Sequence, residues 1–253
     1  MDDADLMIDV RDLHKAFGPI RAVDGVSFKA RKGEVLGFLG PNGAGKSTTM
    51  KILTCFMSPD GGTATVSGHD ICDEPVQVRQ KLGYLAENAP VYEEMTPDSF
   101  LRFVCDARGI DGSERTEAIE RIAKTCSIAD VMHQPIGTLS KGYRRRLGLA
   151  QALIHDPPVL ILDEPTDGLD PNQKHDVRML IKRLAKEKCI VISTHILEEV
   201  DSCCSRIVII DRGKVVRDTT PSELREKEGG ELDEIFRKLT TRDTAKAGMG
   251  GGA

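Results

Sequence analysis

One short segment constrains the fold of this chain more than any other. Residues 40–47 read GPNGAGKS, preceded by the apolar run VLGFL and followed by TTMKIL. A glycine-rich loop between a buried strand and a helix is the P-loop pattern, which predicts a phosphate-binding loop in an α/β core. A glycine-rich turn that matches by chance is the alternative, and the flanking strand and helix argue against it.

Such a loop surrounds a nucleotide phosphate with backbone N–H groups and with the N-terminus of the following helix. We expect Lys46 to reach the β and γ phosphates and Ser47 to supply an oxygen to Mg²⁺. The predicted nucleotide-binding segment consists of Gly40, Pro41, Asn42, Gly43, Ala44, Gly45, Lys46, Ser47 and Thr48.

A second apolar run ends in two acids, PVLILDEP at residues 158–165. Open α/β sheets bind ligands at the carboxyl ends of their strands. Asp163 is therefore predicted to hold Mg²⁺, through water, and Glu164 to polarise an attacking water as the general base. A strand that runs into an acidic surface turn is the alternative, and the P-loop elsewhere in the chain favours the catalytic interpretation.

Short apolar runs alternate with helical patterns, which predicts an α/β fold with a mostly parallel sheet. Val35–Leu39, 159–162 and 190–193 are almost continuously apolar, as strands covered on both faces are. The shorter and more polar segments 8–13 and 63–67 are predicted to form an antiparallel edge. The Asp-Arg-Gly sequence at 211–213 predicts a hairpin turn.

Helical spacing dominates between residues 95 and 155, and Thr96 followed by Pro97 predicts a helix start. Two apolar stripes are predicted there, one of Phe100, Phe103 and Val104 and one of Ile119, Ile122 and Ala123.

We predict a single domain over residues 1–240. It has an α/β core at about 6–94 and 156–224 and a helical subdomain at about 95–155. A C-terminal amphipathic helix at 231–240 places Leu232, Ile235, Phe236 and Leu239 on one face. Residues 241–253 contain too little apolar mass to order themselves and are predicted to be a flexible tail.

Composition excludes several classes of protein. A net charge of −5 and a pI near 5.7 argue against nucleic acid as the main partner, because phosphate neutralisation needs a basic surface. The sequence has no apolar run of about 20 residues, the length that crosses a membrane. Its acidic start, MDDADLMIDV, does not match a secretory signal.

The seven cysteines form no C-x-x-C pair, which indicates reduced thiols rather than a disulfide framework or a zinc site. For the adjacent Cys203 and Cys204 we weigh a redox switch against ordinary packing near a helix end. Packing is favoured, because free cysteine behaves as a small hydrophobe.

The segment TLSKGYRRRLGLAQAL, residues 138–153, indicates what the nucleotide is used for. Ser140 can cap an amphipathic helix whose apolar side carries Tyr143, Leu147, Ala150 and Leu153. The segment also resembles the signature motif of ATP-binding-cassette (ABC) ATPases, usually LSGGQ and here LSKGY at 139–143.

The resemblance extends over about residues 6–220 and implies roles for further residues. Phe17 matches the aromatic residue that stacks on adenine. GPNGAGKST and LILDEP match the Walker A and Walker B motifs, and GLDP matches the D-loop, whose Asp170 reaches across a dimer interface. His195 in ISTHILEE matches the switch histidine that senses the γ-phosphate, although a lone histidine after a strand is more often structural.

Two departures from the family pattern point to a subgroup. Glu87 occupies the Q-loop position where most relatives have glutamine; a carboxylate there can bind Mg²⁺ or its water but adds negative charge near the phosphates. Lys141 and Tyr143 replace a glycine and the glutamine of the signature motif, whereas Ser140 and Gly142 remain. Both departures are similar to variants in the subgroup that works with ABC-2-type exporter permeases.

The resemblance implies a head-to-tail homodimer in which each ATP lies between the P-loop of one copy and Ser140 of the other. It further implies ATP hydrolysis with Glu164, His195 and Lys46 as catalytic residues. The expected partner is an integral membrane permease, and the expected location is the cytoplasmic face of the cell membrane. The motifs do not indicate which substrate is transported.

Two other functions remain open at this point. One is a soluble ABC-type ATPase that acts on ribosomes or DNA, although such relatives usually carry tandem cassettes or a long coiled coil. The other is a dimeric nucleotide sensor without transport.

Overall fold

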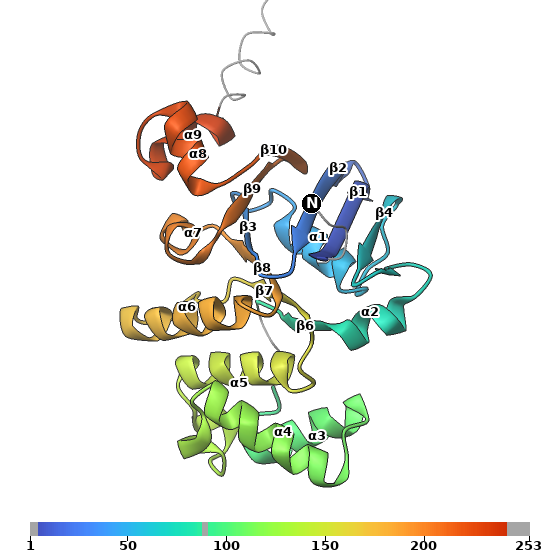
Figure 1. Cartoon of the computed structure of the whole chain (residues 1–253), viewed down its shortest axis with the longest axis vertical. Coiled ribbons are helices and arrows are strands. Elements are labelled where there is room, and N and C mark those ends of the chain that lie inside the picture. The colour runs from blue at the N-terminus through green and yellow to red at the C-terminus, as the bar shows by residue number, and fades with distance from the viewer. Residues whose placement is uncertain (1–4, 88–90, 242–253) are drawn as a thin grey trace, which may run out of the picture.

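The computed structural model of the chain describes residues 5–87 and 91–241 (Figure 1). Of the predicted tail at 241–253, only Thr241 is described, as the last residue of a helix. The rest of that segment lies outside the described residues, as do residues 1–4 at the acidic start and Asn88 in the Q-loop region. No helix in the described ranges is long and apolar enough to cross a membrane.

The larger sheet has six strands in the order β10-β9-β3-β8-β7-β6. They are β3 (Val35–Leu39), β6 (Leu82–Leu85), β7 (Val159–Asp163), β8 (Cys189–Thr194), β9 (Arg206–Asp211) and β10 (Lys214–Thr219). All neighbours from β9 to β6 are parallel, and β10 pairs antiparallel with β9. Every residue of β3, β7 and β8 is buried, which confirms the three predicted buried strands. The predicted hairpin at 211–213 is confirmed by the antiparallel pairing of β9 with β10, in which Asp211 faces Lys214.

A smaller antiparallel sheet has the order β2-β1-β4-β5. Its strands are β1 (Leu6–Phe17), β2 (Ile20–Arg31), β4 (Gly61–Val66) and β5 (His69–Asp70). Helix α1 (Lys46–Leu53) lies between the two sheets (Figure 1). Val10 and Phe28 from the small sheet, Phe38 from β3 and Met50 from α1 share one apolar cluster, which fixes the start of α1 relative to both sheets.

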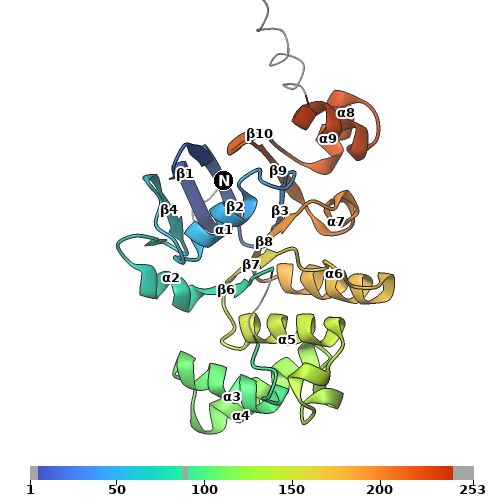
Figure 2. The ribbon, with the colours of Figure 1, turned by 180° about the vertical axis from the view of Figure 1, so that it is seen from behind.

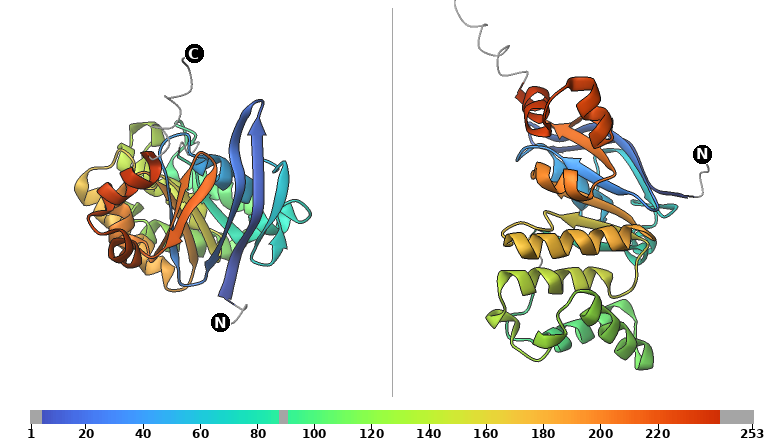
Figure 3. Two further views of the ribbon diagram at one scale, coloured as in Figure 1. Left: turned by 90° about the horizontal axis from the view of Figure 1, so that it is seen from above. Right: turned by 60° about the vertical axis from the view of Figure 1, so that its left-hand side comes forward.

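The remaining helices are α2 (Pro75–Lys81), α3 (Pro97–Arg108), α4 (Gly112–Thr125), α5 (Lys141–Leu153), α6 (Pro171–Ala185), α7 (Leu197–Cys203), α8 (Pro221–Glu228) and α9 (Leu232–Thr241). Short 3-10 helices cover Ala129–Val131 and Ile136–Thr138. Helices α3 and α4 lie at the end of the molecule opposite α8 and α9, and α5 and α6 lie between α3–α4 and the sheet (Figure 2; Figure 3, right).

Helix α3 begins as predicted, because the Thr96 hydroxyl accepts a hydrogen bond from the Ser99 backbone N–H. Phe100 and Val104 are buried, but the prediction for Phe103 was wrong, since 49% of this residue is exposed. The buried side of α3 continues through Leu101 and Cys105 instead, which leaves Phe103 on its flank, edge-on to the Tyr92 ring. The second predicted stripe, in α4, is buried throughout.

The predicted C-terminal helix is confirmed as α9. Leu232, Ile235 and Leu239 are buried in a third apolar cluster with Val200 of α7 and residues of β9, while Phe236 is partly buried. The C-terminal helices therefore cover the part of the sheet next to α7.

All seven cysteines are free. Cys203 is buried at the end of α7 and Cys204 is partly buried beside it, which is the arrangement that the packing interpretation requires.

Candidate nucleotide-binding site

The loop between β3 and α1 has a backbone that only glycine accommodates easily. Gly43 and Gly45 have φ angles of 79° and 103°, in the region that L-residues with a side chain rarely adopt. A Cβ on Gly45 would also lie 2.2 Å from the Ala22 carbonyl oxygen of β2. The loop is therefore fitted against the small sheet, and α1 begins directly after it.

A second contact supports this loop beside the first, since a Cβ on Gly45 would also lie 3.5 Å from the Gly213 Cα. The Gly213 N–H, in the β9–β10 turn, donates to the Ala44 carbonyl oxygen at 2.9 Å. The Gly213 carbonyl oxygen in turn accepts from the Asp24 N–H at 2.8 Å. The sequence predicted this turn only as a hairpin, and its role as a brace for the phosphate-binding loop was missed.

Lys46 is buried at the start of α1, with 6% of the residue exposed. Its ammonium group donates to the carbonyl oxygens of Gly40 at 2.7 Å and Pro41 at 3.2 Å. Burial lowers the pKa of Lys46, and the nearby carboxylates of Glu164, Asp163 and Glu87 act in the opposite direction. The lysine thus places a positive charge inside the loop, where it can attract a negatively charged phosphate group.

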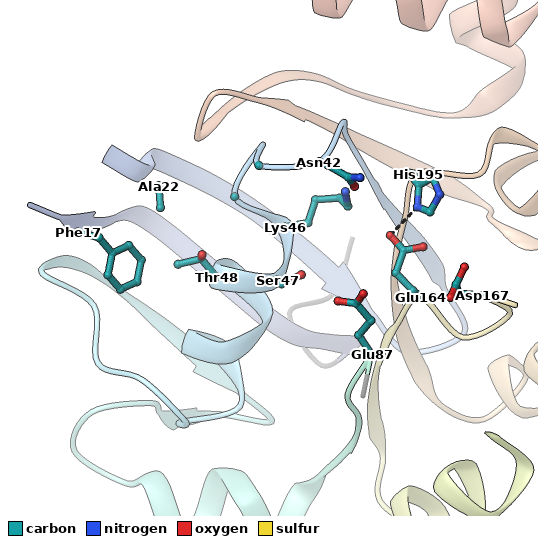
Figure 4. A pocket seen from close by; sticks show the side chains of 12 residues that line it. Phe17, Ala22, Asn42, Lys46, Ser47, Thr48, Glu87, Glu164, Asp167 and His195 are labelled. Atoms are coloured by element: carbon teal, nitrogen blue, oxygen red, sulfur yellow. Dashed lines mark hydrogen bonds and ion pairs between the residues drawn. The ribbon is translucent and has the colours of Figure 1, made fainter. Parts of the chain in front are cut away.

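A pocket of about 510 Å³ opens beside this loop (Figure 4). It is lined by Phe17, Ala22, Asn42, Gly43, Gly45, Lys46, Ser47, Thr48, Glu87, Glu164, Asp167 and His195. Phe17 lies at one end, with Thr48 beside it, and the acidic residues lie at the other end with His195 (Figure 4). This separation matches a ligand that is aromatic at one end and needs metal and catalytic groups at the other.

Phe17 is the last residue of β1 and is 47% exposed, so one ring face is free to meet a ligand. The Lys15 ammonium lies 6.0 Å from the centre of the ring.

The acidic end of the pocket is built by β7 and β8. Asp163 ends β7, and its carboxylate accepts a short hydrogen bond from the buried hydroxyl of Ser193 in β8. The N–H of Glu164 donates to the Ser193 carbonyl oxygen at 2.9 Å. Ser193 therefore orients both acids, although the sequence analysis did not identify it.

Glu164 is a non-glycine residue with a φ of 49°, a conformation that costs energy and often occurs at functional sites. Its Oε1 lies 2.9 Å from Nδ1 of His195, 31 residues further along the chain. Its Oε2 is buried and has no hydrogen-bond partner among the protein atoms. One carboxylate oxygen is thus held by the histidine, and the other is enclosed by protein atoms without a hydrogen-bond partner.

Glu87 follows β6, and its exposed side chain points toward Lys46 and Ser47 (Figure 4). With Asp163 and Ser47 it offers the oxygen ligands that Mg²⁺ prefers. Within the described ranges, no three His, Cys, Asp or Glu side chains lie close enough to form a complete metal site. This donor set fits Mg²⁺, which keeps several waters and shares its coordination with substrate phosphates.

Six predicted nucleotide ligands do not line the pocket. Gly40, Pro41 and Ala44 belong to the phosphate-binding loop itself, whereas Ser140, Gly142 and Asp170 lie on other elements. The predicted metal ligand Asp163 directly precedes the lining residue Glu164 and does not line the pocket either. The exposed Ser140 caps α5 by accepting from the Tyr143 N–H at 3.3 Å, and Asp170 caps α6 by accepting from the Asn172 N–H at 3.0 Å.

Gly142 is buried, and a Cβ there would lie 2.5 Å from the Gln173 side chain. This close packing gives the glycine a structural role within one copy, in addition to its expected contact with a phosphate.

Asp167 lines the pocket beside Glu164, and the sequence analysis missed it. The ammonium group of Lys141, at the start of α5, lies 3.5 Å from its carboxylate. Lys141 also passes directly over Gly168, where a Cβ would lie 1.7 Å from the lysine Nζ. The loop after Glu164 is thus in contact with the signature segment of the same chain.

These features define a P-loop ATPase cassette. A phosphate-binding loop supported by a neighbouring turn lies beside a parallel sheet, two acids lie at the end of β7, and a histidine follows the end of β8. The chain belongs to the ABC transporter family, because the family pattern described as ABC transporter matches residues 23–167.

The chain is similar to the probable multidrug ABC transporter ATP-binding protein YbhF of Escherichia coli K12. The two are 36% identical over 220 residues, which is 87% of this chain and 38% of YbhF, so the chain spans less than half of that relative. It is also 36% identical over 248 residues to the Nod factor export ATP-binding protein I of Burkholderia lata, covering 95% of this chain and 80% of that protein.

A solved structure described as the ATP binding subunit of an ABC transporter superposes with a TM-score of 0.83 at 29% sequence identity. The superposition covers 92% of this chain and 99% of the other. The predicted fold class is therefore confirmed, and the chain is an ATP-binding protein of this family.

Proposed function

We propose that this chain hydrolyses ATP at the interface of a head-to-tail homodimer and thereby drives a membrane permease that exports its substrate. One observation supports the dimer most directly: the pocket contains the P-loop, Glu164 and His195, whereas Ser140 lies outside it on an exposed helix start. A second copy related by a two-fold axis would bring its own Ser140 to the first copy's nucleotide and form two equivalent sites.

In each site, Phe17 stacks on the adenine ring and the loop from Gly40 to Thr48 surrounds the phosphates. Lys46 neutralises the β and γ phosphates. Ser47, Asp163 and Glu87 would hold Mg²⁺, which would offset the charge of the phosphate oxygens. The buried Oε2 of Glu164, which has no protein partner, is the atom that accepts a proton from the attacking water.

His195 holds the other oxygen of Glu164, so it can respond to the γ-phosphate and the base together. Across the interface, Ser140, Gly142 and Asp170 of the second copy complete the site. Charge-assisted hydrogen bonds to the γ-phosphate join the two copies. When hydrolysis removes the γ-phosphate, these bonds are lost and the copies separate.

A groove on the surface is the proposed docking site for the permease. It has a volume of about 550 Å³ and is lined by residues of α2, β6 and α3 and of the segment after α1. Phe56 of that segment and Val76 of α2 are exposed there. Leu82 and Tyr84 of β6 line it too, and the same strand leads directly to Glu87 in the nucleotide pocket. Two residues, Leu85 and Ala86, separate Tyr84 from Glu87, so a permease segment seated there would be linked closely to the phosphate site.

Export, an ABC-2-type permease and a position on the cytoplasmic face of the membrane are inferred from the signature and Q-loop variants and from the Nod factor export relative. A soluble ATPase that acts on ribosomes or DNA is the second candidate, which the net charge of −5 disfavours. We also propose that residues 1–240 work as one cassette, with its core at about 6–94 and 156–224 and its helical subdomain at about 95–155.

The test is Glu164→Gln, which removes the proposed base but keeps the size of the side chain. We expect ATP affinity to be retained, turnover to fall by at least about 100-fold and Mg·ATP to convert the variant to dimers. Sedimentation velocity with and without Mg·ATP measures the dimer, and Mg·ADP is the matched control. A variant that stays monomeric in saturating Mg·ATP, alone and with a permease, would refute the dimer.

A further inference from the structure

Arg145 of α5 makes an unusual set of contacts. Its guanidinium group donates to five backbone carbonyl oxygens, those of Ala86, Glu87, Asp163, Glu164 and Pro165. The distances to Ala86 and Glu87 are 2.9 and 2.8 Å, and the distance to Pro165 is 3.2 Å. These five acceptors come from two segments that are separated by more than 70 residues in the sequence.

The chemistry of arginine matches this arrangement. A guanidinium group has five N–H donors in a rigid planar fork and no acceptor. Only 8% of Arg145 is exposed, so its donors need partners within the protein, and five carbonyl oxygens supply them. Burial lowers the pKa of Arg145, which the carboxylates of Asp163, Asp167, Glu164 and Glu87 oppose.

The acceptors belong to the segments that carry the acidic residues of the pocket. Glu164 has the strained φ of 49°, with its N–H held by Ser193 and its carbonyl oxygen held by Arg145. The carbonyl oxygen of Glu87 is held by the same guanidinium group. One buried side chain therefore fixes the backbone at the proposed base and at a proposed metal ligand.

We propose that Arg145 is a positioning residue that sets the catalytic geometry of Glu164 and Glu87 and makes that geometry depend on the position of α5. Arg145 does not touch the nucleotide pocket itself and acts through the backbone of these two acids. Ser140 caps the same helix, five residues before Arg145. A movement of the Ser140 end of α5 is thus transmitted to the acids of its own copy.

This coupling rests on the proposed dimer, in which Ser140 contacts the nucleotide of the other copy. Engagement of Ser140 on one nucleotide would then fix Glu164 at the other nucleotide, so that each site becomes active when its neighbour is assembled.

The test compares Arg145→Lys with Arg144→Lys in the full chain, with its permease if turnover requires one. Lysine keeps the charge but has three donors for the five carbonyl oxygens. We expect Arg145→Lys to lower kcat at least tenfold, to change the affinity for a fluorescent ATP analogue less than threefold and to raise the Mg²⁺ concentration for half-maximal turnover. The side chain of Arg144 is 40% exposed, and its ion pair with Glu93 is long, at 3.8 Å. Lysine at this position should therefore leave all three measurements unchanged.

Arg145→Gln extends the series, with a larger expected loss of kcat, and melting temperatures in Mg·ADP verify that both variants are folded. The inference is overturned if Arg145→Lys turns over within twofold of wild type. It is equally overturned if kcat and nucleotide affinity fall by the same factor, because that result indicates general damage to the pocket. Failure of Glu164→Gln to dimerise would refute the proposed dimer and leave this comparison intact.

Discussion

The P-loop and the signature segment, which we propose to hold one nucleotide, are built in different ways. The P-loop is supported by its own chain, with Lys46 buried, Gly45 against Ala22 and Gly213 bonded to Ala44. Ser140 in the signature segment is exposed, and its hydroxyl accepts a hydrogen bond from the Tyr143 N–H of the helix that it caps. The first region is complete within one copy, and the second presents its key residue to the outside.

This difference indicates how such a site can respond to its ligand. A preformed loop binds phosphate without first ordering its backbone, so a single copy can hold ATP with little entropic cost. An exposed serine gains its second partner only when another molecule arrives. Binding and assembly are therefore assigned to separate regions of one chain, and each can be removed independently by substitution.

The largest expected effect is on ATP turnover, when one copy carries a defective P-loop and the other carries a defective signature segment. Lys46→Ala disables the P-loop, and Ser140→Arg blocks the signature segment; each variant alone should lose turnover by about 100-fold or more. In a mixed dimer, one site combines both defects and the other is intact. A one-to-one mixture contains about half mixed dimers, so independent sites would give about a quarter of wild-type turnover. The proposed coupling through Arg145 would lower this value, because the intact site belongs to the copy whose Ser140 is replaced.

The measurement is steady-state ATP hydrolysis at a constant total concentration of protein. Each variant at the same total concentration is the control, and a fluorescent ATP analogue should bind to Ser140→Arg alone but not to Lys46→Ala alone. If the mixture neither hydrolyses ATP faster than its components nor forms dimers in Mg·ATP, the two regions do not meet across an interface between copies.

A smaller effect is expected at the brace behind the P-loop. Gly213 and Gly33 have similar φ angles, 77° and 81°, but a Cβ on Gly213 would lie 3.0 Å from the Ala22 carbonyl oxygen, whereas Gly33 has open space. Alanine at either position should lower the free energy of unfolding by about 1 kcal/mol. Only Gly213→Ala should also weaken ATP binding, by roughly fivefold.

Chemical denaturation and titration with a fluorescent ATP analogue measure the two quantities. Equal ATP affinities for Gly213→Ala and Gly33→Ala would show that the turn does not support the loop.

The sequence predicted those parts of the site that depend on short-range patterns. The P-loop and the acids of β7 each belong to one continuous segment with a recognisable pattern, and both segments line or border the pocket. Periodicity placed Phe100 and Val104 correctly but not Phe103, because a helix stripe has flanks on which an apolar residue can be exposed.

Arg145 and Gly213 could not be predicted, because their partners are backbone groups. Every residue but proline offers the same N–H and carbonyl groups, so such contacts leave no pattern in the sequence. Ser193 and Asp167 depend on which strand ends and loops the fold brings together, and this information is long-range. The pairing of His195 with Glu164 was within reach only through the resemblance to a known family.

The smallest expected effect concerns Lys141, which stands where the family pattern has glycine. Its ion pair with Asp167 is exposed on both sides, at 61% and 54%, so Lys141→Met should change the free energy of unfolding by less than about 1 kcal/mol. Its position beside Ser140 adds a positive charge to the surface that we propose meets the partner's phosphates. We therefore expect turnover to fall roughly threefold, with unchanged ATP binding to a single copy.

Asp167→Asn separates the two possible origins of this effect. If Lys141 acts on the partner's nucleotide, Lys141→Met should raise the ATP concentration needed to dimerise the Glu164→Gln variant. Asp167→Asn should not raise it beyond any change in ATP binding to a single copy, which is measured separately because Asp167 lines the pocket. Equal shifts in both variants would assign the effect to the ion pair within one copy. In that case the signature segment would resemble the P-loop more closely, as a region arranged by contacts inside its own chain.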